Sequence, residues 1–247
     1  MSRNGQSSGA PPSIWLQPTT TARKRQLERD AVVRAAIAVA DRGGEVALTM
    51  AAVARELGPY TTMALYRYVG SKGGLIDLML DDVTGEIPVP DSLGSDWRAQ
   101  IYALASASWA MVKRHIWFAQ LVHTRPPLGP RMMRRTEFML AVFTGQGASL
   151  GDAMTYAALL DRHIYGSALQ EAEERAMRLH FGIESARQLT AAIMAARERA
   201  AAGGYPNLER WMAAPSGASL DEQFELSLQF LLDGITVRLS DQPDPRR

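Results

Sequence analysis

Residues 48–75, LTMAAVARELGPYTTMALYRYVGSKGGL, constrain the fold of this chain more than any other stretch. Thr49 is a good helix N-cap, and apolar residues follow it at helical spacing. The Gly58–Pro59 pair then ends this short helix, because glycine favours a helix end and proline cannot continue a helix. A short amphipathic helix with an abrupt stop is therefore expected here.

A second short helix is expected directly after this break. Thr61 or Thr62 can cap it, and Leu65 and Val69 share its inward face. Hydroxyl, aromatic and cationic groups surround that face at Tyr66, Arg67 and Tyr68. Such groups bind DNA phosphates, and arginine also reads guanine edges. The pattern indicates a DNA-binding helix-turn-helix, with an ordinary packing hairpin as the alternative.

Three segments, RAAIAVADRG (34–43), LTMAAVARELG (48–58) and LYRYVGSKGGL (65–75), resemble the DNA-binding domain of the TetR family of transcriptional regulators. The resemblance implies an all-α repressor whose helical core binds a small-molecule inducer that releases DNA. The DNA-contacting residues expected on this basis are Thr49, Tyr60, Thr61, Thr62, Met63, Tyr66, Arg67, Tyr68 and Lys72.

The chain departs from the family pattern at two places. Six residues separate Gly58 from Leu65, where the family usually has five, so an altered turn or recognition-helix start is expected. Ala51 and Ala52 occupy first-turn positions that often carry polar or basic groups in the family. We therefore expect fewer base or phosphate contacts from the first of the two helices.

The rest of the chain is alanine-rich and predicts helices with no convincing strand. Prolines at 88 and 90 indicate a domain boundary. The expected organisation is a flexible basic arm (1–25), a helix-turn-helix domain (26–74), a connecting helix and linker (75–95), and a helical ligand-binding and dimerisation domain (96–241). Helices are expected over about 27–42, 75–86, 96–114, 115–122, 131–144, 150–179, 184–202 and 219–239.

The arm has two interpretations. The basic cluster 23–25 either contacts phosphates or a minor groove, or is part of a solvated tail. The apolar triplet 14–16 within it is expected to dock on the body of the protein or on a neighbouring molecule in a crystal.

Composition excludes several classes of protein. Zero cysteines rule out disulfides and thiol catalysis, and no apolar run of membrane-spanning length or signal peptide occurs, so we expect a cytoplasmic protein. No phosphate loop, nucleophile elbow or histidine spacing typical of metal sites is present, so neither an enzyme, a cofactor nor a metal is expected. Residues 1–80 hold ten Lys/Arg against six Asp/Glu, a net +4, which suits a DNA-binding part.

The last helix predicts a homodimer. One apolar stripe, which includes Leu231, is expected to face the chain's own core, while Leu226, Phe230 and Val237 lie off that stripe. The longest helix is apolar on several sides and contains Gly166, which suggests close approach of another backbone. A four-helix bundle between two subunits would use both helices, although both stripes could also be buried within one chain.

Large aromatic and apolar side chains supply candidates for the ligand pocket: Trp109, Met111, Trp117, Phe138, Tyr156 and His163. Such residues suit a flat, lipophilic compound, but at helical spacing they also serve as plain core. The leading hypothesis is a ligand-responsive repressor of a palindromic operator. The alternatives are a constitutive DNA-binding regulator and a helical small-molecule-binding protein or enzyme.

Overall fold

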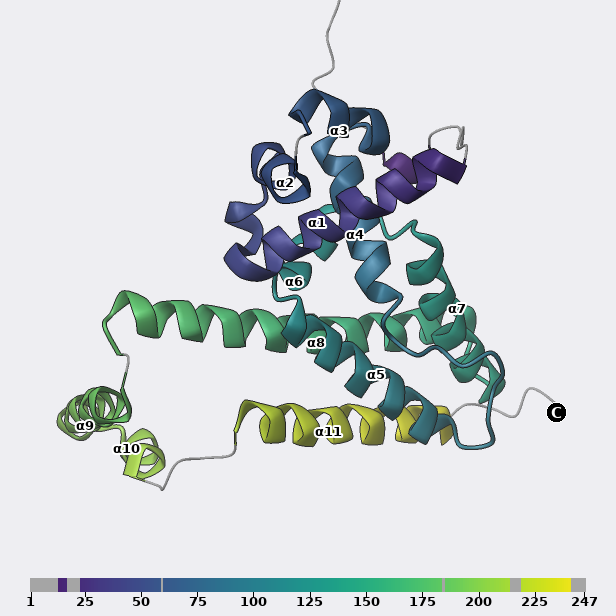
Figure 1. The fold of residues 1–247 in the computed structure, drawn as a ribbon. Coiled ribbons are helices and arrows are strands. Elements are labelled where there is room, and N and C mark those ends of the chain that lie inside the picture. Colours follow the sequence, from purple (N-terminus) through teal and green to yellow (C-terminus); the bar gives the residue numbers. More distant parts are fainter. Residues whose placement is uncertain (1–12, 17–22, 59, 184, 214–218, 241–247) are drawn as a thin grey trace, which may run out of the picture.

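The computed structural model describes residues 13–16, 23–58, 60–183, 185–213 and 219–240, and every regular element in these ranges is helical (Figure 1). The all-α expectation is therefore confirmed. The α-helices are α1 (Arg23–Ala47), α2 (Met50–Leu57), α3 (Thr62–Val69), α4 (Lys72–Thr84), α5 (Trp97–Arg114), α6 (Trp117–Leu121), α7 (Pro130–Gly145), α8 (Leu150–His180), α9 (Ala186–Ala202), α10 (Pro206–Ala213) and α11 (Leu220–Ser240). Two 3-10 helices are η1 (Ile14–Leu16) and η2 (Val122–Thr124).

Helices α1, α2 and α3 form the upper end of the molecule in Figure 1, and α4 runs from them toward the lower helices. Local caps set the starts of three of these elements. The side-chain oxygens of Thr49, Thr61 and Ser71 each accept a hydrogen bond from the backbone N–H three residues on, at 3.1, 3.3 and 2.9 Å. These caps separate α2, α3 and α4 although the connections between them are short.

A small apolar core holds the upper helices together. Leu65 and Val69 of α3 are fully buried, as the spacing predicts, and they share this core with Val53 of α2. Ala36 and Ala40 of α1 are also fully buried, and their small side chains let α1 approach α2 and α3 closely. The inward face of α3 is thus used completely, which leaves its opposite face outside.

Helix α1 begins earlier than the sequence predicts. It begins at Arg23, so the basic cluster 23–25 belongs to its first turn rather than to an arm. Its regular geometry breaks close to the expected end at residue 42, because Gly44 adopts a non-helical conformation with a φ of 68°, and a short helical turn then follows to Ala47. Helix α4 likewise begins three residues before the expected position 75, because Ser71 caps it.

Residues 13–16 are docked on the body, as expected for this apolar triplet. Ile14 and Trp15 pack against the core, whereas Leu16 stays exposed. The Ser13 hydroxyl donates a 2.8 Å hydrogen bond to Asp77 of α4. The region expected as a flexible arm is therefore anchored at this point, and its other parts, 1–12 and 17–22, lie outside the described residues.

The lower helices pack around α8, and their buried side chains belong to the same continuous apolar core as those of the upper helices. Helix α8 contacts α5, α6, α7 and α11, so it is buried on more than one side, as expected from its composition. The largest fully buried side chains of this core are Ile101, Met111, Trp117, Phe118, Met139, Phe143, Leu160 and Ile164.

One expectation about the lower helices is wrong in detail, and one stays open. Among the described residues of one subunit, a side chain at Gly166 would meet no atom within 4 Å, so the expected close approach of another backbone is left to a second subunit. On α11 the fully buried residue is Leu232 rather than Leu231, which is half-buried. Leu226, Phe230 and Val237 are exposed, at 56%, 65% and 60%, so the chain's own core does not cover this stripe.

Helices α9 and α10 pack on each other and stand beside the rest of the lower bundle (Figure 1). Helix α10 was not expected, because the sequence predicts no helix between residues 202 and 219. Pro206 instead opens the helix, at a position where the missing N–H costs nothing. Among the described residues, no helix is long and apolar enough to span a membrane.

Candidate nucleic-acid interface

The outward face of α3 carries the polar, apolar and cationic groups that the sequence singled out. Thr62, Met63, Tyr66 and Arg67 are exposed, while Leu65 between them is buried. Exposed and buried residues alternate in this way because residues three and four apart share one face of a helix. The helix therefore presents a continuous outer surface of hydroxyl, thioether, phenol and guanidinium groups, all of which can reach a base edge or a phosphate.

The other expected DNA-contacting residues flank this face to different extents. Tyr60, which is 43% exposed, lies just before α3, and Lys72 is exposed at the first position of α4. The hydroxyl oxygens of Thr49 and Thr61 already cap α2 and α3. Tyr68 is half-buried and packs against the core, so it faces away from the outward surface.

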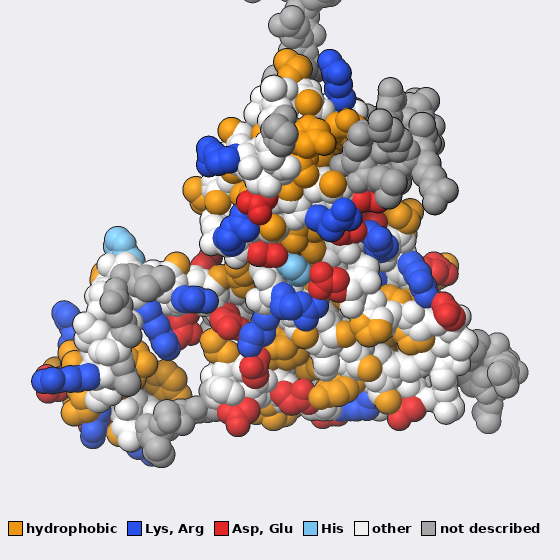
Figure 2. All heavy atoms as spheres, viewed as in Figure 1, with side chains coloured by type: hydrophobic (Ala, Val, Ile, Leu, Met, Phe, Trp, Pro, Cys, Tyr) orange, Lys and Arg blue, Asp and Glu red, His pale blue; other side chains and the backbone are white. Residues whose placement is uncertain are grey.

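Charge near α3 is positive. Between residues 49 and 73 the only acidic residue is Glu56, and Arg42 forms an ion pair with it. Arg55, Arg67 and Lys72 supply positive charge in the same stretch. Figure 2 shows Lys/Arg and hydrophobic side chains at the upper end of the molecule, whereas the acidic side chains in view lie lower down. The surface formed by residues 49–73 can therefore approach a polyanion without an uncompensated carboxylate.

Helix α4 connects this end to the lower helices through buried carboxylates. Asp77 receives hydrogen bonds from Arg125, from Nε at 2.6 Å and from Nη2 at 2.9 Å. The Asp77 and Arg125 side chains are 1% and 11% exposed. Asp77 also accepts from the Ser13 hydroxyl and the Ile14 N–H. One carboxylate thus joins α4, residues 13–14 and the segment before α7.

Asp81, one turn further along α4, caps a different helix. Helix α7 has no side-chain cap of its own, and Asp81 Oδ1 accepts from the backbone N–H groups of Arg131 at 2.8 Å and Met132 at 3.1 Å. Gly129 lies so close that a Cβ there would clash with the carboxylate. Burial raises the pKa of Asp81 above its ordinary value, although these hydrogen bonds oppose the shift.

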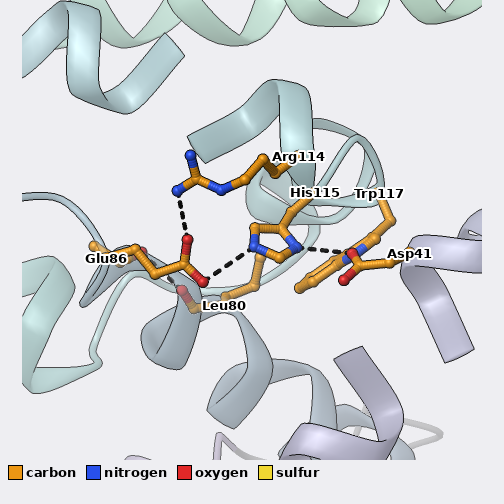
Figure 3. Close-up of polar contacts among 7 residues, drawn as sticks. Asp41, Leu80, Glu86, Arg114, His115 and Trp117 are labelled. Carbon is orange, nitrogen blue, oxygen red and sulfur yellow. Dashed lines mark hydrogen bonds and ion pairs between the residues drawn. The ribbon is translucent and has the colours of Figure 1, made fainter. Parts of the chain in front are cut away.

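A third contact lies just beyond the end of α4, where Glu86, His115 and Asp41 line up (Figure 3). His115 places Nδ1 2.7 Å from Asp41 and Nε2 3.1 Å from Glu86. Trp117 Nε1 donates to Asp41 at 2.7 Å, and Arg114 donates to Glu86 at 2.6 Å. Burial raises the pKa of Glu86, but the hydrogen bonds from Arg114 and His115 outweigh it and lower that pKa. The network ties α1, the end of α4 and the α5–α6 junction together.

These three contacts were not predicted from the sequence, although one signal was available. Asp77 and Asp81 lie four residues apart on one face of α4, and residues 78–80 between them are apolar; both carboxylates are buried. Buried carboxylates need partners, and such a pair therefore predicts specific contacts. The sequence does not say which segments supply those partners.

Two of the expected ligand-pocket residues come together in the lower bundle. Trp109 of α5 stacks on Phe224 of α11 with ring centroids 4.3 Å apart, and His163 of α8 stacks on Phe224 at 4.9 Å. Burial lowers the pKa of His163, against a weaker opposing hydrogen bond. The three aligned rings join α5, α8 and α11.

The other four candidates do not join this stack. Trp117 is fully buried and belongs to the His115 network. Tyr156 meets Phe143 edge to face at 5.5 Å, while Met111 and Phe138 are core residues on α5 and α7. The structure thus spreads the six residues over several parts of the lower bundle.

An open groove of about 500 Å³ runs beside the ring stack between α5 and α11. The polar residues of its lining were missed from the sequence: Tyr102 donates to Glu225 at 2.9 Å, and Lys113 pairs with Asp221 at 2.7 Å. These pairs link residues more than 100 positions apart, and the sequence carries no sign of such partners.

A buried polar cluster lies deeper in the lower bundle. The Arg135 guanidinium is 2.8 Å from Asp161 and donates to Ser108 at 3.2 Å. Burial disfavours the charged guanidinium, but Asp161 outweighs this and raises the pKa of Arg135. Burial also raises the pKa of the nearby Tyr165. This cluster places charge inside the bundle on α5, α7 and α8.

Comparison with known proteins decides the family. The family model for the tetracyclin repressor-like C-terminal domain matches residues 89–239, more than half of the chain. The chain belongs to the TetR family. It is 34% identical to the HTH-type transcriptional repressor DrrR1 of Streptomyces coeruleorubidus, over 93% of this chain and 82% of that protein. It is 31% identical to an HTH-type transcriptional regulator of Saccharopolyspora erythraea, over 96% of each chain.

A solved structure shares the fold. ActR of Streptomyces coelicolor in complex with actinorhodin superposes with a TM-score of 0.72 at 24% identity, covering 91% of this chain and 100% of that one. The resemblance to TetR-family regulators at residues 34–75 is thus confirmed, and the chain is a DNA-binding transcriptional regulator of that family.

Proposed function

We propose that this TetR-family regulator binds a palindromic operator as a homodimer, as a repressor that a small lipophilic ligand releases. Residues 26–74 would bind DNA, residues 75–95 would transmit the signal, and residues 96–241 would bind the ligand and the second subunit. Because such a regulator must reach its operator, we place it in the cytoplasm.

The observation that carries the proposal is the outward face of α3. Its Thr62, Met63, Tyr66 and Arg67 side chains are exposed on a short helix whose opposite face is fully buried. This is the arrangement in which a recognition helix enters a major groove. Lys72 at the start of α4 would hold a phosphate beside it.

The uncovered stripe of α11 supports the homodimer. Leu226, Phe230 and Val237 are spaced along one exposed side, with Gly234 between them open to the outside. Gly166 of α8 is also exposed with no neighbour within 4 Å, which would let a partner's helix approach. Two-fold pairing through α8 and α11 would bury these groups and set two α3 helices on half-sites about 34–36 Å apart.

The aromatic content of the lower bundle supports a ligand. The Trp109–Phe224–His163 stack and the adjoining groove offer flat apolar surface with polar edges. ActR, which shares this fold, binds actinorhodin. We extend that property to this chain as a compound class only, namely flat and lipophilic.

The buried carboxylates of α4 supply a route from ligand to DNA. Asp77 and Asp81 fix α4 to the segments that begin α7, and Lys72 lies at the start of the same helix. A ligand that shifts α7 or α5 would move α4 and so change the separation of the two α3 helices. A near-complete switch needs a preference for the released state of about 10⁴-fold.

The test is a selection of random duplex DNA against the purified protein at two salt concentrations, followed by titration of the enriched duplex in the presence of flat aromatic compounds. The proposal predicts an enriched palindrome and a compound that lowers operator affinity. DNA binding without any enriched sequence would contradict the proposed recognition of a specific operator. Operator binding that no compound weakens would contradict release by a ligand and would favour a constitutive regulator.

A further inference from the structure

We propose that Met63 reads a thymine methyl group, so that each operator half-site carries a thymine opposite the first turn of α3. The inference rests on the proposed DNA binding by α3 and adds to it a base preference and the residue that sets it.

Met63 is exposed in a way that the rest of α3 does not explain. Its side chain is 69% exposed, whereas the apolar residues Leu65 and Val69 of the same helix are fully buried. It is the second residue of α3, two positions after the N-cap Thr61. The N-terminal residues of a recognition helix are those that contact base edges.

The side chains of α3 restrict which bases it can read. Its sequence, TMALYRYV, contains no Asn or Gln, the usual bidentate readers of adenine, and no Asp or Glu, which accept from cytosine. Arg67 can read guanine through two hydrogen bonds. The remaining distinctive group on a base edge in the major groove is the thymine C5-methyl, which binds apolar side chains.

Met63 is the large apolar side chain that α3 holds toward this groove. Tyr66 and Arg67 lie three and four residues further on, so they share its side of the helix. Tyr66 is 38% exposed and ends in a hydroxyl, which suits a phosphate or sugar contact. Thr62 also has a methyl group, and it is therefore the competing candidate for the thymine contact.

Deoxyuridine tests this contact directly because it lacks only the C5-methyl of thymine. In the enriched operator, each thymine is replaced singly by deoxyuridine, and affinity is measured by fluorescence anisotropy. For the wild type we expect one position in each half-site at which a single replacement lowers operator affinity about fourfold, because one apolar methyl group is removed. Replacing this thymine in both half-sites should lower the affinity about 15-fold.

Three variants assign the effect to a side chain. Met63→Ala should bind the thymine operator more weakly and lose the deoxyuridine effect at that one position. Met63→Leu should keep it, because leucine retains apolar contact. Met133→Ala, a methionine 51% exposed on α7, is the matched control and should behave as the wild type.

Several results would overturn the inference while operator binding stands. These are an operator without thymine in its half-sites, equal wild-type affinity for every deoxyuridine duplex, or an unchanged deoxyuridine effect in Met63→Ala, which would assign the contact to Thr62. Failure to enrich any sequence would instead contradict the proposed function itself.

Discussion

Asp77 and Arg125 form a bidentate ion pair that is almost completely enclosed, with the two side chains 1% and 11% exposed. The pair joins α4, which begins beside the recognition helix, to the segment that precedes α7. A pair this deeply buried adds little net stability, but breaking it is costly because the remaining charge stays in the interior. Its value lies in fixing the position of α4.

Removal of one member of this pair should destabilise the fold. Among the described residues, Arg125→Met leaves the buried Asp77 carboxylate with only Ser13 and Ile14 as partners, and we expect a loss of about 3 kcal/mol in the free energy of unfolding. Urea denaturation measures it. Arg134→Met is the control, because its partner Asp91 is 96% exposed and the loss there should be below about 1 kcal/mol. Equal losses in the two variants would contradict a special role for Asp77.

The pH dependence of stability should report Asp81. Because burial raises its pKa, the folded state binds its proton more tightly than the unfolded state does. The stability tied to this proton is complete below the unfolded pKa of 3.8 and is lost as pH rises through the higher folded pKa. Asp81→Asn lacks this titration, so its stability should improve relative to the wild type over that window. Parallel stability curves for the two proteins would contradict the assignment.

The sequence predicted the helix-turn-helix well because its determinants are local. The cap at Thr49, the Gly58–Pro59 break and the spacing of Leu65 and Val69 all act within a few residues, and the structure has each helix within two residues of its expected start. The same locality produced errors. Helix α1 begins four residues before its expected start at 27, and Pro206 opens α10 where no helix was expected.

The joints between helices could not be predicted because their partners lie far apart in sequence. Asp77 meets Arg125 at a separation of 48 residues, and His115 meets Asp41 at 74. From a single sequence we can predict that a buried carboxylate needs a partner, but we cannot predict which residue that partner is. The prediction that six aromatic and apolar residues line one pocket failed for the same reason. Trp109 and His163 both stack on Phe224, while Trp117 belongs to a different contact.

The α11 stripe should control assembly. Phe230→Glu places a charge on a side chain that is 65% exposed in one subunit and would be buried in the dimer. We expect the variant to sediment as a monomer at concentrations where the wild type is a dimer. Leu93→Glu, at a residue 50% exposed outside α8 and α11, is the control and should leave the dimer intact. A Phe230→Glu dimer would place the interface elsewhere.

The salt dependence of operator binding should report the phosphate contacts. Arg67→Ala combined with Lys72→Ala removes two cations beside each α3, four in the dimer, so the slope of log affinity against log salt should become shallower by about 4. Arg134→Ala, on α7, should leave the slope unchanged. An unchanged slope in the double variant would exclude direct neutralisation of phosphates by these two residues.

The central claim is that two α3 helices, held at a fixed separation by the dimer, read two half-sites as one unit. The most direct test inserts five base pairs, about half a helical turn, between the half-sites of the enriched operator, and compares its affinity with that of a single half-site. The account predicts that the insertion lowers affinity to the single-half-site level, because the second α3 then faces the wrong side of the duplex. Undiminished affinity for the lengthened operator would contradict it.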